Sequence, residues 1–151
     1  MTNTTKKKIK INKNKTSKKK MTHAVKFEQD ISYFFLKLLL VIKLYHWNTH
    51  SYAAHKSTDE LYESLNKHMD RFMEILFGKT GKRLSFKNIS LEIPSISTKK
   101  EIEKYIAECK GYLVDLNDNI FLHKMSNFDL FTIRDEILGD LNQFLYLLSF
   151  M

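Results

Sequence analysis

The near absence of residues that break helices is the feature that most limits what this chain can fold into. Pro94 is the only proline among 151 residues, and there are only four glycines. The stretches between them carry apolar residues three or four positions apart, which is the spacing of one helix face. Scarce breakers combined with this spacing predict an all-α fold made of long helices.

Four helices are expected after a basic N-terminal segment. The first is predicted over residues 26–48 and is apolar nearly all the way round. The second is predicted over 52–77, beginning near Ser51 and ending at Gly78, because glycine is a frequent residue just after a helix. An alternative start for the second helix is Ser57, which has a glutamate three positions later.

The third and fourth helices have recognisable starts. Thr98 and Glu101 form a capping-box pattern, and an apolar stripe follows as far as Ile120. The fourth helix follows Ser126 or Asn127. Four amphipathic helices of this length favour an antiparallel four-helix bundle over residues 23–151. The apolar outer face of the first helix indicates that a second subunit covers it.

The positive charge of the chain is concentrated at its N-terminus. Residues 1–20 contain nine lysines and no acid, and setting them aside leaves 16 basic residues against 17 acidic ones. We expect residues 1–22 to be a disordered tail that binds DNA by releasing counterions from the phosphates. A solvated tail without a ligand, or a nuclear-localisation signal, is the alternative. The candidate DNA-binding residues are Lys6, Lys7, Lys8, Lys10, Lys13, Lys15, Lys18, Lys19 and Lys20.

Neither a membrane nor an oxidising compartment is indicated. The apolar run "YFFLKLLLVIKLYHW" is shorter than a membrane span and is interrupted by Lys37 and Lys43. The tail lacks the apolar core of a secretory signal. A single cysteine, Cys109, excludes an internal disulfide. We therefore expect an intracellular protein with no membrane contact.

A polar stripe borders the apolar face of the second helix. Its members form two pairs, His55 with Asp59 and Asp70 with Glu74, and the members of each pair are four residues apart. Each pair can bind one metal ion from one face of the helix. The pairs are eleven residues apart, which is about 16 Å along a helix. One chain therefore cannot use both pairs for one metal centre.

Two chains can use both pairs together. If two copies of this helix cross antiparallel about a dyad, His55 and Asp59 of one chain meet Asp70 and Glu74 of the other, and two equivalent sites form. His46 is expected to complete the first half-site, with His50 as its substitute. Two histidines with carboxylates suit iron, and also zinc or manganese. The metal-free alternative is a charged helix face at a subunit contact, with Arg134 neutralising a buried carboxylate.

The same residues resemble a known family. The pattern HW…H-x3-D-x10-D-x3-E, with the runs LYHWNT and TDELY, is similar to that of the Dps miniferritins and looks closest to Dps-like proteins of large DNA viruses. The specific match covers about residues 44–78. His46 and Trp47 match the family's His-Trp pair, His55 its second histidine, and Asp59, Asp70 and Glu74 its acids.

This resemblance implies a fold, a chemistry and partners. The expected fold is a ferritin-like four-helix bundle, and the expected function is binding and oxidation of Fe(II) at inter-subunit sites, a ferroxidase activity with iron storage. The expected assembly is a homo-oligomer, at least a two-fold dimer, with the family's dodecamer as the larger alternative and with DNA bound by the tail. A viral source would place it in the cytoplasm or nucleus of a host cell, or in the virion. The alternative is a metal-silent ferritin-like structural or DNA-packaging protein, with no cofactor.

Overall fold

The structure is a computed structural model, and it describes residues 23–86, 88–123 and 126–151. No strand occurs within these ranges, and the prediction of an all-α fold is confirmed. The predicted tail and its nine lysines lie outside the described residues. The helices are α1 (His23–Asn48), α2 (Tyr52–Thr80), α3 (Lys99–Asp115), α4 (Ile120–His123) and α5 (Phe128–Leu148), with a 3-10 turn, η1 (Leu116–Asp118), before α4.

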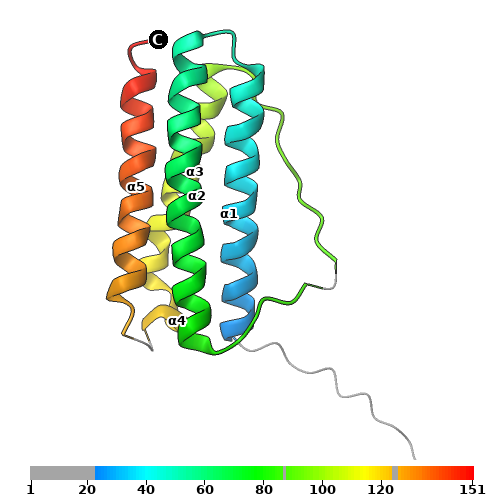
Figure 1. Ribbon diagram of the computed structural model, residues 1–151, viewed down its shortest axis with the longest axis vertical. Coiled ribbons are helices and arrows are strands. Elements are labelled where there is room, and N and C mark those ends of the chain that lie inside the picture. The colour runs from blue at the N-terminus through cyan, green and yellow to red at the C-terminus, as the bar shows by residue number, and fades with distance from the viewer. Residues whose placement is uncertain (1–22, 87, 124–125) are drawn as a thin grey trace, which may run out of the picture.

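The four long helices lie side by side with their axes nearly aligned (Figure 1). Helix α1 runs toward one end of the molecule, and α2 returns beside it. The connector after α2 then runs back along the side of the bundle, so that α3 begins near the α1–α2 loop. Helix α5 contacts both α2 and α3, and α1 contacts α2. These contacts bury the apolar stripes that predicted the helices.

Aromatic contacts join helices that are distant in sequence. Phe35 on α1 meets Phe72 on α2 edge to face, with ring centroids 5.3 Å apart. Phe34 stacks on Tyr112 of α3 at 4.2 Å. Such pairs add to the free energy gained by burying their apolar area. The polar stripe of α2 is therefore held on a packed scaffold.

The start of α2 agrees with the sequence, whereas its end does not. Ser51 is the N-cap residue, and its side chain accepts a hydrogen bond from the backbone N–H of Ala54. The helix passes Gly78 and ends one turn later, at Gly81, whose φ of 64° is the left-handed conformation that glycine adopts readily. The prediction that this helix ends at Gly78 was therefore wrong.

The start of α3 also agrees with the sequence. Thr98 and Glu101 form the predicted capping box, with both reciprocal hydrogen bonds present. Two backbone N–H groups donate to the Glu101 carboxylate, and they lower its pKa. The prediction that the apolar stripe of this helix continues to Ile120 was wrong, because α3 ends at Asp115 and η1 follows. No helix within the described ranges is long and apolar enough to cross a membrane.

Candidate metal centre

The candidate centre lies where α1 ends and α2 begins. Helix α1 continues through Asn48, residues 49–51 form the turn, and α2 starts at Tyr52. The last turn of α1 therefore lies beside the first turn of α2. His46 and His55 meet there, with their rings stacked at a centroid distance of 3.7 Å and an interplanar angle of 25°.

Three possible ligand atoms converge at this junction. His46, His55 and Asp59 each offer one atom, and these atoms lie within 4.8 Å of one another. The Nε2 atom of His46 is 3.5 Å from Oδ1 of Asp59. Two imidazole nitrogens and a carboxylate oxygen are ligands for iron, zinc or manganese. No other group of three such side chains occurs in the part of the chain that the structure describes.

The other nitrogen of each imidazole is already engaged. Nδ1 of His55 lies 3.0 Å from the backbone carbonyl oxygen of His46. Nδ1 of His46 lies 3.0 Å from the backbone carbonyl oxygen of His55 and 3.0 Å from the hydroxyl oxygen of Thr58. Such contacts orient metal-binding histidines and leave Nε2 as the ligand atom.

The cluster is buried on one side and open on the other. His46 is 7% exposed, and Thr58 beneath it is fully buried. The Asp59 side chain is 41% exposed, so the carboxylate lies at the mouth. An ion could enter from the Asp59 side and would meet the two imidazoles at the closed end.

The remaining predicted ligands lie elsewhere on the same chain. Asp70 and Glu74 are exposed further along α2 and are not part of the cluster. His50 is exposed and does not replace His46. One chain thus brings together three of the five predicted ligands and holds the other two apart, as the eleven-residue spacing requires.

Arg134 does not serve this cluster. Its Nη1 donates to the carbonyl oxygen of Leu113 at 3.0 Å and to Oδ1 of Asn117 at 2.9 Å, and its Nε donates to Asp135 at 2.7 Å. These partners lie near the end of α3, in η1 and on α5, and the end of α3 is at the opposite end of the bundle from the α1–α2 turn (Figure 1). Arg134 therefore does not neutralise Asp59, and its carboxylate partner is Asp135.

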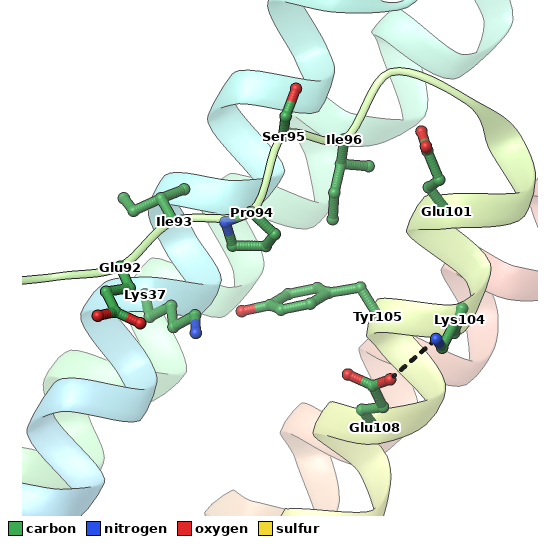
Figure 2. A pocket seen from close by; sticks show the side chains of 10 residues that line it. All are labelled: Lys37, Glu92, Ile93, Pro94, Ser95, Ile96, Glu101, Lys104, Tyr105 and Glu108. Atoms are coloured by element: carbon green, nitrogen blue, oxygen red, sulfur yellow. Dashed lines mark ion pairs between the residues drawn. The ribbon is translucent and has the colours of Figure 1, made fainter.

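A cavity of about 550 Å³ lies away from the cluster, between α1, α3 and the connector. Tyr105 points from α3 across it toward Lys37 (Figure 2). Among its charged groups, Glu101 caps α3 and Lys104 lies 3.9 Å from Glu108. Burial raises the pKa of Tyr105, so this phenol stays protonated.

Two polar contacts were missed by the sequence interpretation. The first is between Thr58 and His46. Thr58 comes one residue before Asp59 and lies on the buried side of α2. A hydroxyl next to a candidate ligand on the buried face is the sequence signal that could have predicted this contact. The second is made by His68, whose Nδ1 lies 2.9 Å from Oδ2 of Asp140. Asp140 is 72 residues away on α5, so no local pattern could have paired them.

Comparison with curated proteins and comparison with solved structures each found no match. Comparison with protein-family models matches residues 46–148, a segment that begins at His46 and contains all five candidate ligands. The chain belongs to this family, which is described as a family of unknown function (DUF5856).

Proposed function

We propose that this chain is a Dps-like miniferritin that binds and oxidises Fe(II) at inter-subunit sites. The observation that carries the proposal is the cluster of His46, His55 and Asp59, in which both Nδ1 atoms are engaged and both Nε2 atoms are available. Iron, zinc and manganese all accept this ligand set, and iron is the proposed substrate.

The course of the chain supports the ferritin-like part of the proposal. A ferritin-like antiparallel four-helix bundle has one long crossover connection. Here the connector between α2 and α3 runs the length of the bundle (Figure 1). The proposed fold is therefore two helical hairpins, α1–α2 and α3–α5, joined by that crossover.

The outer face of α1 and α2 supports a two-fold dimer. A mostly apolar hollow of about 230 Å³ lies between these helices, and Asp70 is among its lining residues. Leu36 and Leu40 on α1 are 44% and 42% exposed. A second copy on this face would cover both leucines and bring its Asp70 and Glu74 to the open side of the cluster. Further copies would build a shell of up to twelve chains.

The proposed reaction needs two ions and one oxidant. Each Fe(II) loses one electron, and one molecule of hydrogen peroxide takes up both electrons and two protons to form two waters; dioxygen is the alternative acceptor. The chain contributes the imidazole and carboxylate ligands that hold the ions. The buried side of the site limits the access of water.

Iron-dependent consumption of oxidant tests the proposal. The wild-type protein should consume peroxide or dioxygen when Fe(II) is added, and the double variant His55→Ala/Asp59→Ala should lose most of this activity. Glu60→Ala is the matched control, because Glu60 is the next acid on α2 and is exposed. Equal rates in all three proteins would leave a metal-silent structural or DNA-packaging protein as the function.

The N-terminal tail is proposed to bind DNA without sequence preference. Its nine lysines carry the positive charge of the chain. Binding through phosphates should weaken steeply as salt is raised. Deletion of residues 1–20 should abolish DNA retardation in a gel and leave iron oxidation unchanged. Undiminished retardation after the deletion would exclude the tail as the binding element.

A further inference from the structure

We infer that Thr58 is a positioning residue of the candidate metal centre. Two crossed hydrogen bonds between His46 and His55 hold both imidazoles in the tautomer that leaves Nε2 free for an ion, and the Thr58 hydroxyl adds a second contact to Nδ1 of His46. The inference depends on the proposed function only for its metal-affinity readout. The tautomers themselves are a property of the metal-free chain.

The crossed bonds follow from the ends of the two helices. His46 lies in the last turn of α1, where backbone carbonyl groups have no N–H partner within the helix. His55 Nδ1 lies 3.0 Å from that carbonyl oxygen and is placed to act as its donor. A carbonyl oxygen can only accept a hydrogen bond, so the proton of neutral His55 is on Nδ1. Its Nε2 then carries the lone pair.

His46 is fixed in the same way by two acceptors. Its Nδ1 is 3.0 Å from the carbonyl oxygen of His55, which again can only accept. The Thr58 hydroxyl lies 2.8 Å from that carbonyl and 2.9 Å from the carbonyl of Ala54. Its single proton therefore goes to one of these carbonyls, and its oxygen accepts from His46 Nδ1–H.

Asp59 favours the other tautomer of His46. Its carboxylate would favour a proton on Nε2 of His46, which would block the metal position. The separation of 3.5 Å exceeds the roughly 2.7–2.9 Å of a charge-assisted hydrogen bond, so this pull is weak. Two contacts at 3.0 Å on Nδ1 outweigh it. The Thr58 hydroxyl, which is fully buried, supplies one of these two contacts and is the only one of them made by a side chain.

The first test is nitrogen-15 NMR of the metal-free protein at a pH where its imidazoles are neutral. His46 and His55 should both show the Nδ1–H tautomer, whereas exposed His50 should show the Nε2–H form that free histidine prefers. In Thr58→Val, the Nδ1 proton of His46 should exchange with solvent several-fold faster. An Nε2–H tautomer of His46 in the wild type would overturn the inference, and so would unchanged exchange in the variant.

The second test is titration with Co(II), a spectroscopic probe for the metal. Thr58→Val should bind Co(II) about 10- to 100-fold more weakly than wild type, the usual effect of losing a group that orients a ligand. Thr58→Ser keeps the hydroxyl and should bind as wild type does. Ser57→Ala is the matched control, because the Ser57 hydroxyl bonds only the carbonyl of Ala54. Wild-type affinity in Thr58→Val would overturn the inference.

The two readouts separate this inference from the proposed function. A wild-type protein that shows Nδ1–H tautomers but takes up no Co(II) would contradict the metal site and support the crossed bonds. A protein that binds Co(II) with Nε2–H tautomers would contradict the crossed bonds and support the metal site.

Discussion

Arg134 is buried on α5, on the face that the spacing of apolar residues predicts to be apolar. Its guanidinium group bonds the carbonyl of Leu113 near the end of α3 and the side chain of Asn117 in η1. It also lies over the ring of Phe131, 5.0 Å from the centroid. Arg134 therefore joins α5 to the irregular chain after α3, where backbone groups lack helical partners.

Replacement of Arg134 should destabilise the fold without affecting the metal centre. Arg134→Met keeps the apolar stem but leaves buried acceptors unpaired, and it should lower the free energy of unfolding by about 2–3 kcal/mol. Arg71→Met, at a side chain that is 59% exposed, should change it by no more than about 0.5 kcal/mol. Urea denaturation measures both. Equal losses, or weaker Co(II) binding in Arg134→Met, would contradict this assignment.

Cys109 is a buried thiol on α3, and its ionisation is coupled to folding. Burial raises the pKa of Cys109 from 9.0 to about 12. In the unfolded chain the thiol ionises near pH 9, whereas the folded chain keeps it protonated. The unfolded state therefore binds fewer protons above pH 9, and stability falls as the pH rises from 9 toward 12. Burial also raises the pKa of Tyr112 to about 12, which adds the same trend above pH 10.

The expected contribution of Cys109 can be measured as a difference in slope. Between pH 9 and 10 the wild type should lose about 1 kcal/mol more stability than Cys109→Ala, because only the wild type has this thiol to ionise when unfolded. Denaturation curves at pH 8, 9 and 10 give the two slopes, and any constant cost of the substitution cancels. Parallel slopes would mean that the native thiol ionises as readily as the unfolded one.

The end of α2 shows how one helix can run past a glycine and stop at another. Gly78 lies inside the helix, and a Cβ added there meets no atom within 4 Å. Gly81 has φ +64°, and its backbone N–H donates to the carbonyl oxygen of Phe77 at 2.9 Å. Both glycines are followed by lysine. The residues adjacent to each glycine therefore give no reason to prefer one as the end.

Alanine at these two glycines should have opposite effects. Gly78→Ala should raise the free energy of unfolding by about 0.5–1 kcal/mol, because alanine restricts the unfolded chain and favours the helix. Gly81→Ala should lower it by about 1–2 kcal/mol, the cost of a left-handed conformation for a residue with a Cβ. Thermal or urea denaturation would detect the difference in sign. Destabilisation by Gly78→Ala would place the helix end at the earlier glycine.

The assembly of whole chains connects the two acidic pairs of α2. Asp59 belongs to the cluster, whereas Asp70 lies three helical turns away beside an apolar hollow. If both aspartates serve one site, that site contains two chains. The proposed dyad then gives each dimer two sites, each with Asp59 from one chain and Asp70 from the other.

Mixed dimers provide a direct measurement of this arrangement. Asp59→Ala and Asp70→Ala should each lower the Fe(II) stoichiometry when prepared alone. A dimer of one variant with the other should regain one intact site of two, because one of its sites carries both substitutions and the other carries neither. Titration with Fe(II) gives the stoichiometries. Wild-type iron binding by a monomer, or a mixed dimer without any site, would contradict the shared centre.

Local patterns in the sequence identify most of the elements. Helix interiors follow from the spacing of apolar residues, and the starts at Ser51 and Thr98 follow from side chains that bond N–H groups within the next turn. These are interactions between residues within one turn of each other. They can be predicted from the sequence because the partners are fixed by their separation along the chain.

The candidate centre is only partly local. His55 and Asp59 share a face of α2 because they are four residues apart, as the sequence indicates. Whether His46 joins them depends on where α1 stops and how tightly residues 49–51 turn, since one further residue of helix would turn the direction in which the chain leaves α1 by about 100°. The crossed bonds between the histidines exist because the two helix ends meet.

Contacts between α2, α3 and α5 depend on the tertiary structure alone. His68 bonds Asp140 and Arg134 bonds Leu113 because of how far each helix is shifted along and rotated against its neighbour. Apolar periodicity predicts which face of a helix is buried, and it does not encode that shift. The sequence therefore determined the helices and the candidate ligands, whereas helix packing decided which polar groups are paired and which nitrogen atoms remain free.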